Sequence, residues 1–148
     1  MKLNLTERYN MGLDQYAGFR DSEGQVQEEF YWRKHARLQK FMAVEFKNQN
    51  KNKGDHSPDK ENNSINELQH LGFNGGQGGV KITKDLLERL EEAYKNGYYD
   101  YFASDGFFWG QQFQEEQVEE YKDQDKKFID WCKEQLNIGK DIAYDCSW

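Results

Sequence analysis

The feature that most constrains this chain of 148 residues is that its large apolar side chains are mainly aromatic. It has 10 Phe, 9 Tyr and 4 Trp against only 19 Leu, Ile and Val together. Disordered chains are poor in aromatic residues, and each such side chain buries roughly 150–250 Å² when it enters a core. We therefore expect a folded protein with an aromatic core, and a chain of this length is typical of one domain.

Charge, hydropathy and cysteine content exclude several classes of protein. The formal net charge is −7 and the pI is about 5.0, whereas a domain that binds nucleic acid is usually basic. No apolar run approaches the ~18 residues of a membrane span, and the N-terminus lacks the apolar stretch of a signal peptide. Cys132 and Cys146 are too few for a disulfide framework and lack metal-ligand spacing. We expect a protein of a reduced cytoplasm with no membrane contact, no metal and no cofactor, and we do not favour nucleic acid as its partner.

Hydrophobic periodicity predicts three helices and several short strands. The helices cover residues 33–47, 84–95 and 115–136, and the second has Thr83 as its N-cap and Asn96-Gly97 as its end. The candidate strands are residues 12–19, 27–32, 80–82, 98–102, 106–109 and 141–146.

Helices do not alternate strictly with strands, so we expect a single α+β domain over residues 1–148. A small, mostly antiparallel sheet would pack against about three helices. Residues 1–10 would form an extra N-terminal segment. Residues 48–64, which are polar and contain the only proline, would form an exposed, mobile loop.

Residues 33–53 form the main basic segment, with seven Lys or Arg and a single acid, Glu45. On the predicted helix its cations share one face, namely Arg33, Arg37, Lys40 and Lys47. That face is either a site for an anion or, as we favour, a solvated surface that offsets acidic neighbours. The opposite, core-facing arc also contains Lys34, His35 and Glu45. Lys34 and Glu45 either form an ion pair beside a pocket or, as we favour, extend to solvent from the edge of the arc.

Two further elements are candidates for function. The segment 106–110 (Gly-Phe-Phe-Trp-Gly) suits either a stacking platform in a binding cleft or a buried strand between tight turns. Asp14 lies beside a glycine and an aromatic residue instead of in a helical charge run. Asp125 interrupts the apolar stripe of the third helix and, if buried, needs a partner such as a tyrosine hydroxyl or Arg33.

Four segments together resemble a family of small uncharacterised proteins of tailed bacteriophages. In chain order they are residues 11–16 (MGLDQY), 31–34 (YWRK), 106–110 (GFFWG) and 144–148 (YDCSW). The resemblance implies a phage accessory protein in the host cytoplasm and implies no reaction. Relatives often have a histidine where this chain has Gln39, so any chemistry of that histidine would be absent here.

The positions that match the motifs of this family imply a shared binding site. The basic helix face adds Arg37 to this site, and the aromatic segment adds Trp109. The candidate binding residues are Asp14, Tyr31, Trp32, Arg33, Lys34, Arg37, Gly106, Phe107, Phe108 and Trp109.

The leading hypothesis is a non-enzymatic protein that binds a host or phage macromolecule, and we assign no catalytic residue. One alternative is a small-molecule-binding protein or enzyme with a cleft near residues 32–34 and 107–109. A second is a contact with single-stranded nucleic acid. A common site requires that residues 31–34 and 106–110 converge in space, and the sequence leaves the oligomeric state open.

Overall fold

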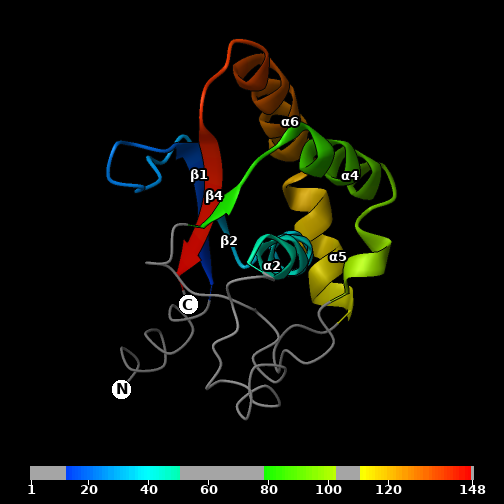
Figure 1. The fold of residues 1–148 in the computed structure, drawn as a ribbon. Helices are drawn as coiled ribbons and strands as arrows, with labels where there is room; N and C mark the ends of the chain where they lie inside the picture. Colours follow the sequence, from blue (N-terminus) through cyan, green and yellow to red (C-terminus); the bar gives the residue numbers. More distant parts are fainter. Residues whose placement is uncertain (1–12, 51–78, 103–110, 148) are drawn as a thin grey trace, which may run out of the picture.

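The fold combines one antiparallel sheet with helices, as the sequence predicts (Figure 1). The structure is a computed structural model, and it describes residues 13–50, 79–102 and 111–147. Within these ranges the elements are β1 (Asp14–Phe19), β2 (Phe30–Arg33), α2 (Ala36–Gln49), β3 (Val80–Lys81), α4 (Lys84–Lys95), the 3₁₀ turn η1 (Tyr99–Tyr101), α5 (Gln111–Glu120), α6 (Lys122–Asn137) and β4 (Ile142–Ser147). The α+β prediction is confirmed.

The sheet brings the first and last described strands together at its centre. Its order is β2-β1-β4-β3, and β1 pairs with β4 along its whole length, from Asp14 opposite Ser147 to Phe19 opposite Ile142. Gly18 in β1 allows the chain that follows to pass close by, because a Cβ at this position would stand 1.7 Å from the carbonyl oxygen of Gln27. Only glycine fits there without a shift of the backbone.

The two faces of the sheet differ in what covers them. Side chains of directly opposed residues share a face, and successive residues of a strand alternate between faces. The inner face packs against the helices and carries Trp32 and Tyr144, whereas the outer face is turned away from them (Figure 1). The outer face carries Asp14, Tyr16, Tyr31, Arg33 and Asp145.

Aromatic side chains make up much of the core between the sheet and α6. Phe128 of α6 meets Trp32 and Phe30 edge-on, with ring centroids 5.0 and 5.2 Å apart. Trp131 approaches Phe30 at 5.4 Å. Edge-to-face pairs of this kind add about 0.5–1.5 kcal/mol beyond the area that they bury. The aromatic core expected from composition is therefore confirmed.

Side chains from the helices occupy both edges of the sheet. At the β2 edge, the Tyr121 hydroxyl accepts a hydrogen bond from the amide of Arg33 (3.0 Å), and Gln124 donates to the carbonyl of Tyr31 (2.7 Å). At the β3 edge, the side-chain amide of Gln49 bonds both the amide and the carbonyl of Lys81. These contacts leave little edge backbone available to pair with another strand.

The helix predicted over residues 84–95 is confirmed as α4, with the N-cap and the end that the sequence indicates. Thr83 accepts a hydrogen bond from the Leu86 amide at the start of α4, and Gly97 follows its end in the left-handed region (φ +67°).

The predicted helix over 115–136 is wrong in detail. It is two helices, α5 and α6, which meet at Tyr121, and α5 already begins at Gln111. The first helix begins at Ala36, three residues later than predicted, because Lys34 adopts a left-handed conformation (φ +59°). The strand predicted over 98–102 is instead the turn η1, which follows the left-handed Tyr98 (φ +56°).

Some sequence predictions fall on parts of the chain that are not described. The strand predicted at 106–109 and the extra segment 1–10 lie outside the described residues. The predicted loop 48–64 begins too early, because α2 continues to Gln49, and its residues from 51 onward lie outside the described ranges.

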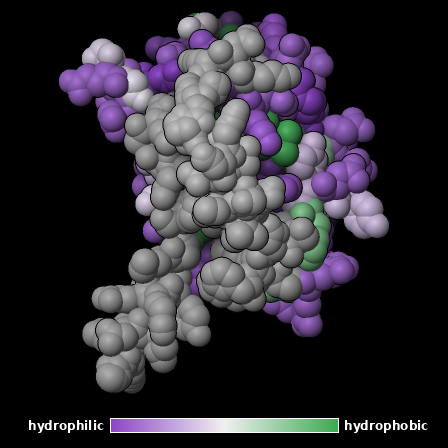
Figure 2. Space-filling model, turned by 60° about the horizontal axis from the view of Figure 1, so that its bottom comes forward, coloured by the Kyte–Doolittle hydropathy of each residue, from purple (hydrophilic) through white to green (hydrophobic). Residues whose placement is uncertain are grey.

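The described surface is hydrophilic over most of the face seen in Figure 2. In the part of the chain that is described, no helix has the length and apolar character needed to cross a bilayer.

Candidate functional site

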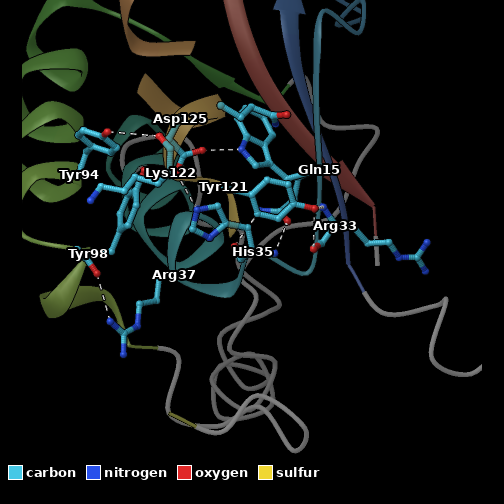
Figure 3. A network of polar contacts seen from close by, with 12 residues as sticks. Gln15, Arg33, His35, Arg37, Tyr94, Tyr98, Tyr121, Lys122 and Asp125 are labelled. Carbon is cyan, nitrogen blue, oxygen red and sulfur yellow. Dashed lines mark hydrogen bonds and ion pairs between the residues drawn. The ribbon is translucent and has the colours of Figure 1, made fainter. Parts of the chain in front are cut away.

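A buried carboxylate organises the polar contacts beneath the β2 strand (Figure 3). Asp125 of α6 is only 2% exposed, and it accepts hydrogen bonds from Trp32 Nε1 (2.7 Å) and the Tyr98 hydroxyl (2.7 Å). Its Oδ2 also lies 2.8 Å from His35 Nε2. Because both oxygens of Asp125 already accept hydrogen bonds, from Trp32 and Tyr98, we assign the proton of the third contact to His35 Nε2.

The His35 ring is enclosed by aromatic side chains. It stacks on Tyr121 with centroids 5.4 Å apart and an interplanar angle of 11°, and it meets Tyr98 edge-on at 5.3 Å. Among the described residues, its Nδ1 has no hydrogen-bond partner. An imidazole oriented by a carboxylate can move protons, but His35 has no exposed surface through which a ligand would reach it. In this conformation the pair is a structural element of the core.

The buried Gln15 and the half-buried Tyr121 fix the backbone that leads from β2 into α2. The Gln15 side chain accepts a hydrogen bond from the His35 amide (2.9 Å) and donates to the His35 carbonyl (3.0 Å). Tyr121 holds the amide of Arg33. Lys34 lies between these two fixed residues in its left-handed conformation, which costs about 1 kcal/mol for a side chain of this kind. Packing and hydrogen bonds on both sides therefore maintain a strained residue at the surface.

Four of the candidate binding residues gather where β1 begins and β2 ends. Asp14 Oδ1 accepts a hydrogen bond from the Tyr31 hydroxyl (2.8 Å) and lies 3.5 Å from Arg33 Nη1. Tyr31 is 41% exposed, and Lys34 follows Arg33 directly. We call this set, Asp14, Tyr31, Arg33 and Lys34, the Tyr31 surface.

Local charges change the acidity of two residues in the Tyr31 surface. The pKa of Tyr31 is raised mainly by burial, and further by the hydrogen bond to Asp14 and the negative charge of Asp14. Burial and the adjacent charge of Arg33 lower the pKa of Lys34, although Asp14 opposes this effect. An anionic group brought to Lys34 by a partner would favour its protonated form.

Two candidate residues lie elsewhere. Trp32 is fully buried on the inner face, since successive strand residues alternate and Tyr31 and Arg33 occupy the outer face. Arg37 is only 6% exposed and donates to the Gly97 carbonyl (3.2 Å), so the predicted basic face of the first helix does not form as a continuous surface. Glu45 is also buried, and its ion-pair partner is Arg89 rather than Lys34 (2.8 Å).

The remaining candidates, Gly106, Phe107, Phe108 and Trp109, lie outside the described residues. Whether residues 31–34 and 106–110 converge is therefore still a prediction.

Sequence reasoning identified only part of the buried network. It singled out Asp125 and proposed a tyrosine hydroxyl as its partner, which Tyr98 supplies. The other proposed partner, Arg33, instead pairs with Asp14. Helical periodicity placed His35 on the core-facing arc, where it is indeed buried, but gave no indication of its partners. No local pattern indicated Gln15, because its burial depends on residues far away in the chain.

Gln39 also belongs to the core. Its Oε1 accepts a hydrogen bond from the buried Tyr144 hydroxyl, which in turn accepts one from Gln15 Nε2. These contacts assign Gln39 a structural role.

Neither cysteine nor carboxylate chemistry suggests a cofactor site in the described ranges. Cys132 and Cys146 are buried thiols, and burial raises the pKa of each. No three His, Cys, Asp or Glu side chains of the described residues gather as metal ligands would. Comparison of the chain with protein-family models, with curated proteins and with solved structures finds no match.

Proposed function

We propose that this chain is a non-enzymatic bacteriophage accessory protein that binds a host or phage protein through the Tyr31 surface. The observation that carries the proposal is an exposed tyrosine beside two cations on a backbone that buried side chains hold in place. Tyrosine and arginine are enriched among the residues that dominate protein-binding energy. A contact surface that is already ordered loses less conformational entropy on binding.

The charges of the Tyr31 surface favour a protein over a nucleic acid as its partner. Arg33 is paired with Asp14, and Arg37, which would extend the positive charge along the helix, is buried. Nucleic acids are held largely by cations that neutralise phosphates. A protein partner suits mixed charge around an aromatic side chain, because interfaces combine aromatic anchors with polar groups at their rim.

The alternative of a catalytic or small-molecule cleft receives less support. Trp32, which would line that cleft, is buried against α6, and the His35–Asp125 pair is also buried. The opposite wall of the proposed cleft, residues 107–109, is outside the described ranges.

The test compares capture by the tagged full-length chain with capture by two variants, each of which truncates one exposed side chain. The tagged chain is incubated with lysates of phage-infected and of uninfected bacteria, and mass spectrometry identifies the protein that it captures. The affinity of that protein is then measured with purified components. We expect Tyr31→Ala to weaken binding by about 30-fold, the effect of losing a hot-spot residue worth about 2 kcal/mol. Ile138→Ala is the control, because Ile138 is an exposed large side chain outside the Tyr31 surface.

Equal binding by the Tyr31→Ala variant and the wild type would refute the assignment of the surface. Failure of the folded wild type to capture any stoichiometric protein would refute the function itself. Arg33→Ala tests the same surface with a smaller structural change, since the Arg33 side chain is one-third exposed and its ion pair with Asp14 contributes little to stability.

A further inference from the structure

A hollow of about 330 Å³ lies between the C-terminal half of α4 and the turn η1. Tyr99 and Tyr101 form its aromatic wall, and Tyr99 is 75% exposed. The residues that line the hollow are Glu88, Arg89, Glu92, Ala93, Asn96, Tyr99, Asp100 and Tyr101.

The electrostatic character of the hollow is negative. Glu88, Glu92 and Asp100 line it, and none of these carboxylates lies within 4 Å of a cationic nitrogen among the described residues. Its one cationic side chain, Arg89, is occupied by Glu45 through two hydrogen bonds of 2.8 Å. The last carbonyls of α4 add the negative end of the helix dipole.

Contacts with the core hold the Tyr101 side of the aromatic wall, and the start of the turn that carries Tyr99, in position. The Tyr101 ring meets Phe41 of α2 edge-on at 5.1 Å, and Tyr98, which begins the turn, is bonded to Asp125. Burial, and the nearby charges of Glu45 and Asp100, raise the pKa of Tyr101, so its neutral ring persists over a wider range of pH. The wall is therefore anchored from two elements.

We propose that this hollow binds an organic cation with a primary ammonium or guanidinium head. The head would lie over the Tyr99 ring while Glu92 and Asp100 accept its hydrogen bonds. Such a cation is attracted to the face of an aromatic ring and makes short hydrogen bonds to carboxylates. The ligand is either a free polyamine or a Lys or Arg side chain of a protein, and this site is separate from the Tyr31 surface.

A second acidic hollow on α5 provides an internal comparison. The described residues that line it are Gln112, Glu115, Glu116, Glu119 and Glu120, and none of these is aromatic. Non-specific attraction of cations to an acidic protein would affect both hollows alike, whereas the proposed site requires the ring as well as the charge.

The experiment titrates the ¹⁵N-labelled full-length chain, at fixed moderate salt, with spermidine and separately with acetyl-Gly-Arg-Gly-amide. We expect saturable shifts of the Asn96, Tyr99 and Asp100 amide signals with at least one probe, and the probe that binds identifies the source of the cation. Glu92→Gln should weaken that binding about two- to fivefold, whereas Glu116→Gln, which removes the same charge from α5, should leave it unchanged. Tyr99→Leu should also weaken it about two- to fivefold, and Tyr99→Phe, which keeps the ring, should restore it.

Three results would overturn the proposal. These are the absence of saturable shifts with either probe, equal effects of Glu92→Gln and Glu116→Gln, and wild-type affinity in Tyr99→Leu. All of the substituted side chains are exposed, and unchanged amide spectra away from the hollow establish that each variant is folded.

Discussion

Asp125→Ala should destabilise the protein far more than any substitution at the surface. The change leaves three buried donors without their acceptor: Trp32 Nε1, the Tyr98 hydroxyl and His35 Nε2. An unsatisfied buried donor costs about 1–3 kcal/mol, and removing one partner of a buried charged contact costs about 3–5 kcal/mol. We expect a loss of about 3–5 kcal/mol, a large share of the ~5–15 kcal/mol that stabilises most domains.

Asp125→Asn should have a smaller effect because the network can rearrange around an amide. The Trp32 indole can only donate, so the amide oxygen must face it. The amide NH₂ then faces Tyr98 and His35, both of which can accept a hydrogen bond, although His35 must move its proton to the unpartnered Nδ1. We expect a loss of about 1–3 kcal/mol, the cost of a single poorly satisfied buried group.

Urea unfolding followed by far-UV circular dichroism measures these differences. Asp123→Ala is the matched control, because Asp123 is exposed in the same first turn of α6 and shares the interaction with the helix dipole. That interaction is worth about 0.3–1 kcal/mol. If Asp125→Ala lies within 1 kcal/mol of the control, the network is not a major source of stability. If the alanine variant does not fold, a loss of less than about 1 kcal/mol in Asp125→Asn refutes the reasoning.

Three further predictions follow from local contacts. Thr83→Ala removes the hydrogen bond that begins α4 and should lower the free energy of unfolding by about 1 kcal/mol in the same urea assay, whereas Thr83→Ser should retain most of it. Because the pKa of Lys34 is lowered and that of Lys126 is raised, a limiting amine-acylating reagent near pH 8 should modify Lys34 before Lys126. Mass spectrometry that shows Lys126 modified before Lys34 would contradict the assigned charges. The thiols of Cys132 and Cys146 should resist a thiol reagent in the native protein and react together on unfolding, because burial raises their pKa and blocks access. Rapid labelling of the native protein would show that the core opens.

Local sequence signals were sufficient where an element depends on its own neighbours in the chain. Thr83 and Gly97 mark the two ends of α4 because capping involves residues within one turn of the helix. The aromatic composition was likewise sufficient to indicate what fills the core. The antiparallel α+β class follows from the order of the elements along the chain.

The assignment of side chains to faces and partners required the folded chain. Asp125 meets Trp32, His35 and Tyr98 across 93, 90 and 27 positions of sequence, distances over which no periodic pattern extends. Burial of Arg37 likewise depends on Gly97, which lies 60 positions away. Propensity and capping act within a few residues, whereas burial and hydrogen bonding depend on which distant segments pack together, and only the three-dimensional arrangement reveals that.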